Sequence, residues 1–273
     1  MLVAVDTGGT KTLVASFSED GTLGEQTKFA TPPKQADYVE KLRELITEKY
    51  SDQEVEAIII AMPGIVKEGV AVWCNNLRWK DFDVKSAMEG VLGDTPILVE
   101  NDANLAGLSE TRILKAMPRQ SLYVTISTGI GTGIITDGHI NPALRLSEGG
   151  RSLVEFDGVV REWESFASGQ AIHKAYGKYA RDITSKQTWY QISDRISRGF
   201  LAIIPLLQPD IIIIGGSIGT YFDRFSSDLQ GILRENLPPH IHCPTFVQAK
   251  YPEEAVIYGC YYYALDSLDN ISI

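Results

Sequence analysis

The hexapeptide Asp6-Thr7-Gly8-Gly9-Thr10-Lys11 joins two segments of strand character, residues 2–5 and 12–17. Adjacent glycines permit positive φ angles and a close backbone approach, so consecutive N–H groups can face a phosphate. The hydroxyls of this stretch add donors, and Asp6 stands at a strand end, where a carboxylate suits Mg²⁺ bound through water. The stretch therefore predicts either a phosphate-binding turn or a plain hairpin turn, since Asp-Gly and Gly-Gly pairs are common in hairpins.

A second turn of this kind is Ser127-Thr128-Gly129-Ile130-Gly131-Thr132-Gly133, again between two strand-like segments. It lacks the lysine of a P-loop and is not followed by a helix, so it fits neither the P-loop nor the dinucleotide fingerprint. Its position in the second half of the chain matches that of the first turn in the first half. Together the two turns predict a clamp on one triphosphate.

A third glycine turn, Gly215-Gly216, follows the apolar run 211–214. Ligands of α/β sheets bind at the carboxyl ends of strands, and glycines leave room for a flat base there. The alternative is a simple connection from strand to helix.

The segment Glu100-Asn101-Asp102-Ala103-Asn104 follows an apolar strand and opens a helical pattern. An aspartate at this place is commonly a helix cap. The functional alternative is a general base that accepts the proton of a phosphoryl acceptor, with Asn101 aligning the nucleophile.

Each half of the chain opens with a strand, a Gly/Thr turn and a second strand, and continues with helices and further strands. This weak internal repeat predicts two lobes with a cleft. Apolar spacing predicts helices over residues 36–50, 103–115, 160–179, 189–207, 221–235 and 253–268, and further strands over residues 57–62, 96–99, 211–214 and 245–248.

Composition excludes several classes of protein. The net charge of −10 argues against a nucleic-acid binder, which needs a basic surface. The cysteines Cys74, Cys243 and Cys260 are odd in number and widely spaced, so neither a disulfide framework nor a structural zinc site is expected. No apolar run is long enough to cross a membrane, and strand character begins at Leu2. We therefore expect a cytoplasmic protein with no membrane or nucleic-acid partner.

These motifs together resemble the ROK family of repressors and sugar kinases, within the actin/hexokinase-like ATPase superfamily. The resemblance extends from residue 6 to about residue 216. It implies an α/β fold of two lobes, built on ribonuclease H-like repeats, with a central cleft. We expect a small lobe over residues 1–103, completed by the C-terminal helix at about 254–273, and a large lobe over residues 104–253.

The resemblance also implies roles for single residues. Asp102 is the catalytic base. The sugar is held by Gly64, Asn76, Asn101, Asp102, Glu148, Arg151 and Glu164. The nucleotide, ATP with Mg²⁺ near Asp6, is held by Asp6, Gly8, Gly9, Thr10, Lys11, Thr128, Gly129, Gly131, Thr132, Gly215 and Gly216.

Two departures from the family pattern concern zinc. The family's E-x-G-H motif is matched by Glu148-Gly149-Gly150-Arg151, so arginine replaces a histidine that touches zinc and sugar. The cysteine-rich zinc loop is absent, with only residues 159–162 between Gly158 and Trp163. We expect a zinc-less member in which Arg151 either bonds a sugar hydroxyl or pairs with Glu148 or Glu155.

The resulting hypothesis is a glucokinase-like enzyme that uses ATP to phosphorylate glucose or a close relative at its 6-hydroxyl. The family suggests a homodimer. Alternatives are polyphosphate as the donor, an N-acetylhexosamine or fructose as the acceptor, and a non-catalytic sugar sensor. The repressor branch is disfavoured because only one strand precedes the Asp6 turn, leaving no DNA-reading helices.

Overall fold

The computed structural model describes residues 1–251 and 254–269, which form two compact units. Unit 1 comprises Met1–Ser109 and Glu254–Ile273, and unit 2 comprises Glu110–Glu253. Residue 253, the expected start of the last helix, and residues 270–273 lie outside the described part. Within that part, no helix combines the length and the apolar character needed to cross a membrane.

Unit 1 contains a five-stranded sheet in the order β3-β2-β1-β4-β8. Strands β1, β4 and β8 run parallel, whereas β2 and β3 extend the sheet as an antiparallel ladder. The bounds are β1 Leu2–Thr7, β2 Lys11–Phe17, β3 Leu23–Ala30, β4 Ala57–Met62 and β8 Ile97–Asn101.

Unit 2 repeats this arrangement with a five-stranded sheet in the order β11-β10-β9-β14-β15. Strands β9, β14 and β15 are parallel, and β10 and β11 are antiparallel. The bounds are β9 Gln120–Ile126, β10 Ile130–Thr136, β11 His139–Ile140, β14 Ile211–Gly215 and β15 Thr245–Gln248. Since the strands appear in the same order in both sheets, the predicted internal repeat is confirmed.

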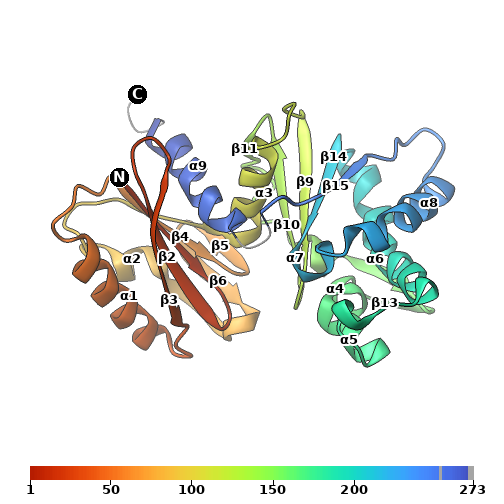
Figure 1. Ribbon diagram of the computed structural model, residues 1–273, viewed down its shortest axis with the longest axis horizontal. Helices are drawn as coiled ribbons and strands as arrows, with labels where there is room; N and C mark the ends of the chain where they lie inside the picture. The colour runs from red at the N-terminus through yellow and green to blue at the C-terminus, as the bar shows by residue number, and fades with distance from the viewer. Residues whose placement is uncertain (252–253, 270–273) are drawn as a thin grey trace. The chain divides into compact units, whose positions relative to one another are not determined.

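Helices cover both faces of the unit 1 sheet (Figure 1). Helix α1 (Gln35–Tyr50) has apolar side chains at helical spacing, and these pack against Val3 and Val5 of β1. The neighbouring strand residues point to the opposite face, and helix α9 (Ala255–Asp269) contacts β1 and β4. Helix α9 also lies against α3 (Asp102–Arg112), where a Cβ on Gly259 would stand 2.1 Å from the oxygen of Leu105.

The remaining elements are short or belong to unit 2. Unit 1 adds a three-stranded sheet and a short helix, with bounds β5 Ile65–Lys67, β6 Val70–Cys74, η1 Asn75–Leu77, β7 Trp79–Asp83 and α2 Val84–Met88. Unit 2 adds η2 Gly149–Arg151, β12 Leu153–Phe156, β13 Val159–Glu162, α4 Glu164–Ala167, α5 Gly169–Tyr176, η3 Ala180–Asp182, α6 Lys186–Leu207, α7 Gly216–Gly219, η4 Phe222–Arg224 and α8 Ser226–Asn236.

The helix predicted over residues 160–179 is wrong at its start. Strands β12 and β13 form a hairpin whose turn, Asp157 and Gly158, has φ angles of 54° and 75°. The β-branched residues Val159 and Val160 favour a strand, and this turn brings them back along β12. Helical structure begins only at Glu164, and it is interrupted before Gly169.

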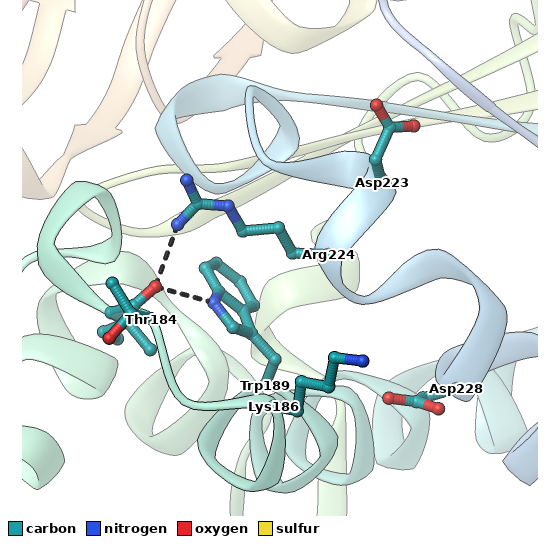
Figure 2. A pocket seen from close by; sticks show the side chains of 7 residues that line it. Thr184, Lys186, Trp189, Asp223, Arg224 and Asp228 are labelled. Carbon is teal, nitrogen blue, oxygen red and sulfur yellow. Dashed lines mark hydrogen bonds between the residues drawn. The ribbon is translucent and has the colours of Figure 1, made fainter.

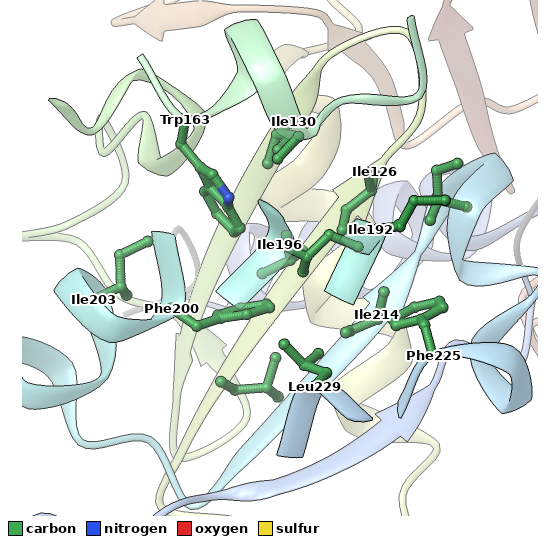
Figure 3. Close-up of a cluster of buried hydrophobic side chains, with 14 of the residues drawn as sticks. Ile126, Ile130, Trp163, Ile192, Ile196, Phe200, Ile203, Ile214, Phe225 and Leu229 are labelled. Carbon is green, nitrogen blue, oxygen red and sulfur yellow. The ribbon is translucent and has the colours of Figure 1, made fainter. Parts of the chain in front are cut away.

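Helix α6 organises the core of unit 2. Its apolar face presents Ile192, Ile196 and Phe200 to the sheet, and Trp163 and Leu229 complete the cluster (Figure 3). Trp163 is fully buried and packs on Phe200 with a ring-centroid distance of 5.1 Å. The indole fits here because residue 199 of α6 has no side chain. A Cβ on Gly199 would stand 2.0 Å from the Trp163 ring.

We predict that Gly199→Ala destabilises the protein by about 1–3 kcal/mol, because the added methyl group displaces a fully buried indole. Urea unfolding followed by tryptophan fluorescence measures this change.

The control is Gly231→Ala in helix α8, where a Cβ would meet nothing within 4 Å. This variant should gain about 0.5–1 kcal/mol, because alanine favours a helix interior over glycine. Equal effects of the two substitutions would contradict the packing assigned to Gly199.

Candidate functional site

The parallel strands of unit 1 bring several predicted site residues to one sheet edge. Asp6 of β1, Ala61 of β4 and Glu100 of β8 pair in one row across the sheet. The chain continues from this row into the Asp6 turn, into Gly64 and into Asp102. The structure thus assembles polar groups from three separate parts of the sequence at the carboxyl ends of these strands.

The Asp6 turn is a tight hairpin between β1 and β2. Gly8 N donates to the Lys11 oxygen at 3.0 Å, and a Cβ on Gly8 would stand 2.7 Å from that same oxygen. Thr31, which follows β3, donates through Oγ1 to the Gly8 oxygen at 2.8 Å. Its backbone N–H donates to the Thr10 oxygen at 3.0 Å. Thr31 is a structural residue that the sequence analysis missed, and no periodicity marks it. The brace leaves the tip, residues 9–11, exposed.

Asn76 lies beside this turn. It belongs to the short helix η1 and is exposed. A Cβ added to Gly9 would lie 3.4 Å from the Asn76 Cβ. The structure therefore brings a predicted sugar ligand next to a predicted phosphate turn.

Asn101 connects the other two predicted groups at this edge. Its Nδ2 donates to the Gly64 oxygen at 2.7 Å and to Asp102 Oδ1 at 3.3 Å. Gly64 has a φ of 82°, and a Cβ there would stand 2.1 Å from the Trp73 oxygen, so only glycine fits. Asp102 opens helix α3, and its Oδ1 also accepts from Ala103 N at 2.8 Å. These bonds fix the orientation of the carboxylate.

The electrostatics of Asp6 are unusual for an aspartate. Burial raises the pKa of Asp6 from 3.8 to about 6, and the positive charge of Lys28 opposes this shift only in part. A carboxylate held with so little compensating charge suits a cation that arrives with a ligand.

The corresponding turn of unit 2 is held by other groups. Ser127 N donates to the Gly129 oxygen at 2.9 Å and the Ser127 oxygen accepts from Gly169 N at 2.6 Å. Glu164 Oε2 accepts from Ile130 N at 2.9 Å, and it would stand 2.5 Å from a Cβ on Gly129. Thr128 at the tip is exposed.

Two residues predicted to bind phosphate with this turn lie within strand β10. Gly131 pairs with Thr125. Thr132 is buried, and its Oγ1 accepts from Gly149 N at 2.9 Å and donates to the Ser147 oxygen at 3.4 Å. In the structure Thr132 thus fastens the segment that carries Glu148.

Three of the predicted sugar ligands lie together in unit 2. Arg151 pairs with Glu164 Oε1 at 3.1 Å and with Glu162 Oε2 at 2.6 Å. Burial raises the pKa of Glu148, the charge of Arg151 opposes this shift, and the charge of Glu164 adds to it. Arg151 thus pairs with Glu162 and Glu164, and its charge also acts on Glu148, one of the two partners that the sequence suggests.

A pocket of about 750 Å³ adjoins the turn of unit 2. Gly215 and Gly216 precede its wall; Gly216 has a φ of 77°, and a Cβ there would stand 2.6 Å from the Ile126 oxygen. The pocket is lined by Ser127, Thr128, Gly169, Gln170, His173, Tyr179, Ala180, Arg181, Ser217, Ile218, Thr220 and Tyr221.

Aromatic groups form much of this wall. His173 and Tyr179 stack at 4.1 Å with planes 8° apart, and Arg181 lies 5.1 Å from the Tyr179 ring. Nδ1 of His173 is buried and has no hydrogen-bond partner in the described structure. The sequence analysis missed these residues because they lie on a helix and a loop that carry no glycine motif.

A second pocket, of about 480 Å³, lies in unit 2 near the start of α6 (Figure 2). Arg224 Nη1 and Trp189 Nε1 both donate to the Ile183 oxygen, at 2.8 and 3.0 Å. The same guanidinium lies 4.8 Å from the ring of Tyr221. Arg224 therefore supports the Tyr221 wall of the larger pocket from behind.

The ROK family model matches residues 2–267 of the sequence. This chain belongs to the ROK family. A putative fructokinase of Bacillus subtilis is 29% identical over 237 residues, covering 80% of this chain and 77% of that protein. An N-acetylmannosamine kinase of Escherichia coli is 27% identical over 244 residues, covering 80% and 83%.

A solved structure of another kinase shares the fold. The inorganic polyphosphate/ATP-glucomannokinase of Arthrobacter sp. strain KM matches this ROK chain with a TM-score of 0.72 at 27% identity, covering 97% of this chain and 98% of that one. The family and the α/β fold with two repeats, both predicted from the motifs, are confirmed, and these relatives are named as sugar kinases.

The stretch before Trp163, where the sequence analysis expects no zinc loop, is a hairpin. In this chain the β12–β13 hairpin fills that stretch and closes with the turn Asp157-Gly158. Among the residues that the structure describes, no group of three or more His, Cys, Asp or Glu side chains is arranged to hold a metal ion. The prominent polar feature beside the hairpin is the cluster of Arg151 with Glu162 and Glu164.

We predict that Asp6→Asn stabilises the ligand-free protein at pH 8 by about 1–3 kcal/mol. The folded state binds the Asp6 proton more tightly than the unfolded state, because its pKa is raised to about 6 from 3.8. The wild type therefore loses stability as the pH rises through this interval, whereas an amide does not ionise.

Urea unfolding at pH 4 and pH 8 measures the effect, and the gap between the two proteins should close at pH 4. Asp52→Asn at an exposed position serves as the control and should leave the pH dependence unchanged. A gap of the same size at both pH values would show that burial of the Asp6 charge is not the cause.

Proposed function

We propose that this ROK protein is an ATP-dependent sugar kinase that phosphorylates glucose or a close relative at its 6-hydroxyl. The observation that carries the proposal is the Asn101–Asp102 pair, held at the sheet edge that also carries the Asp6 turn. A carboxylate oriented by an amide beside a glycine hairpin is what phosphoryl transfer to a hydroxyl needs, namely a base and a phosphate seat.

In the proposed reaction Asp102 accepts the proton of the sugar 6-hydroxyl. The freed oxygen forms a bond to the γ-phosphorus of ATP, the bond from that phosphorus to the bridging oxygen breaks, and ADP leaves. Asn101 orients Asp102 through the bond between their side chains. Positioning supplies most of the acceleration, because the reaction needs little covalent chemistry from the protein.

The sugar is assigned to side chains that can bond hydroxyl groups in pairs. Within unit 1 these are Asn76 and Asn101 with the backbone at Gly64. Within unit 2 they are the carboxylates Glu148 and Glu164. Carboxylates and amides discriminate between sugars because a missing hydroxyl leaves a buried polar group unpaired. The raised pKa of Glu148 fits a site that is completed by hydroxyl donors.

Within unit 2 the nucleotide is assigned to the glycine turn 127–129 and to the pocket beside it. Within unit 1 the Asp6 turn is assigned to phosphate. Exposed backbone at residues 9–11 and at Thr128 offers donors to phosphates. The base would lie against the wall of Tyr179 and Tyr221, near Gly216. Bound Mg²⁺ neutralises phosphate charge, and Asp6 is the residue that would hold it.

The same pocket favours ATP over polyphosphate as the donor. A polyphosphate groove needs a row of cations, whereas Arg181 and the stacked His173–Tyr179 pair present mainly aromatic surface. The Arthrobacter relative is named for both donors. The fructokinase and N-acetylmannosamine kinase relatives keep fructose and N-acetylhexosamines as alternative acceptors. A sugar sensor without catalysis is disfavoured by the oriented Asp102.

We predict that Asp102→Asn lowers kcat by about 10²- to 10⁴-fold, because the amide does not accept the hydroxyl proton. Sugar affinity, measured by calorimetry, should stay within about threefold of the wild type. ADP release with MgATP is followed across glucose, mannose, fructose, allose, N-acetylglucosamine and N-acetylmannosamine.

Asp94→Asn, at an exposed position on another loop, is the matched control and should retain full turnover. Full turnover in Asp102→Asn would refute the assignment of the base. A wild type that phosphorylates none of these sugars, with ATP or with polyphosphate as the donor, would favour the hypothesis of a sugar sensor without catalysis.

We also predict that Tyr179→Ala raises KM for ATP about tenfold through lost stacking on the base. Polyphosphate has no base, so any rate with polyphosphate should not change. Tyr190→Ala, which removes an exposed tyrosine of α6 outside the pocket, is the control. An unchanged KM for ATP in Tyr179→Ala would show that the adenine base does not stack on Tyr179 in this pocket.

A further inference from the structure

Glu164 links two features of unit 2 that are far apart in the sequence. It is the first residue of α4, and its two carboxylate oxygens have different partners. Oε2 accepts from the backbone N–H of Ile130 at 2.9 Å, and Oε1 pairs with Arg151 at 3.1 Å. One carboxylate therefore bridges the start of β10 and the arginine of η2.

The contact with the turn is close. A Cβ on Gly129 would stand 2.5 Å from Glu164 Oε2, so the carboxylate lies directly against the turn backbone. Ile130 is the residue at which β10 leaves the turn, and its own ladder partner is Ile126. The position of Glu164 thus helps to set the path of residues 127–130.

Arg151 in turn holds Glu164 in place. Its Nη1 pairs with Glu162 Oε2 at 2.6 Å, and its Nη2 pairs with Glu164 Oε1 at 3.1 Å. Without the guanidinium, Glu162 and Glu164 would face each other uncompensated, with Glu148 also nearby. Repulsion would then drive Glu164 away from the turn. The planar fork of arginine suits this task because it bonds two carboxylates at once.

We propose that Arg151 is a positioning residue that acts through Glu164 on the turn 127–129 and thereby sets nucleotide affinity, without contacting the sugar itself. The nucleotide part rests on the proposed function, whereas the effect on the turn does not. The replacement of the family's histidine by arginine then has a physical role: the residue that would face the sugar instead braces the phosphate turn.

The test compares Arg151→Met, Arg151→Lys and the wild type by three readouts. Hydrogen exchange of the Ile130 amide, followed by NMR, should become about tenfold faster in Arg151→Met, because a hydrogen bond to a charged acceptor is weakened. The Kd for MgADP without sugar, measured by calorimetry, should rise about tenfold. The KM for the sugar is the third readout, and it should also rise, because the displaced Glu164 is itself assigned to the sugar.

Arg151→Lys should recover part of the effect, because an ammonium group pairs with one carboxylate but not with both in a fixed plane. Arg161→Met is the matched control. It removes an equal charge from the neighbouring strand β13, where Arg161 bonds the Phe156 oxygen. Ile130 exchange and the Kd for MgADP should stay at wild-type values in this control, and near-UV circular dichroism checks that each variant is folded.

An unchanged Ile130 exchange rate together with a large rise in the sugar KM would overturn the proposal and make Arg151 a sugar ligand. Equal effects of Arg151→Met and Arg161→Met would overturn it as well, because charge alone would then be the cause. If the wild type phosphorylates no sugar, the proposed function fails, but Ile130 exchange still tests the brace.

Discussion

The strict register of three parallel strands is the constraint on which the site depends. In unit 1, Asp6, Ala61 and Glu100 stand in one row, so the chain leaves β1, β4 and β8 at the same level of the sheet. A slip of one residue would turn Asp6 to the opposite face of its strand. Both faces of β1 and β4 are buried, so a shift would exchange Val3 and Val5, packed in the cluster with α1, for the smaller or differently shaped residues of the other face, and the repacking opposes it.

The two units solve the same problem with different chemistry. Each must hold a glycine-containing turn rigid while its tip stays exposed. In unit 1 the neutral hydroxyl of Thr31 braces the turn. In unit 2 the charged side chain of Glu164 does so, and it needs Arg151 to be kept in place. A charged brace is stronger but responds to neighbouring charges, whereas a hydroxyl responds little to them.

The glycine motifs, the apolar runs and the repeat could be predicted from the sequence because each rests on local chemistry. Apolar spacing predicted the strand end and helix start at which Asp102 lies, whereas its role as the base came only from the resemblance to the ROK family. Thr31, His173 and Tyr179 could not be predicted, since their roles arise from contacts across long sequence distances. The stretch 160–179 misled because apolar residues at 159, 160 and 163 fit helix and strand alike, and only the turn at Asp157 and Gly158 favours the hairpin.

Unit 1 is made of two pieces of chain, with α9 supplied by the C-terminal segment. During synthesis on the ribosome, the sheet of unit 1 emerges first and the helix that covers its second face emerges last. Unit 2 lies wholly between these pieces, so all of its strands and helices are available earlier. Until α9 arrives, the apolar face that it contacts lacks this helix, and exposed apolar surface favours aggregation of incomplete chains. Unit 1, whose sheet is synthesised first, is therefore completed only after unit 2 has been synthesised.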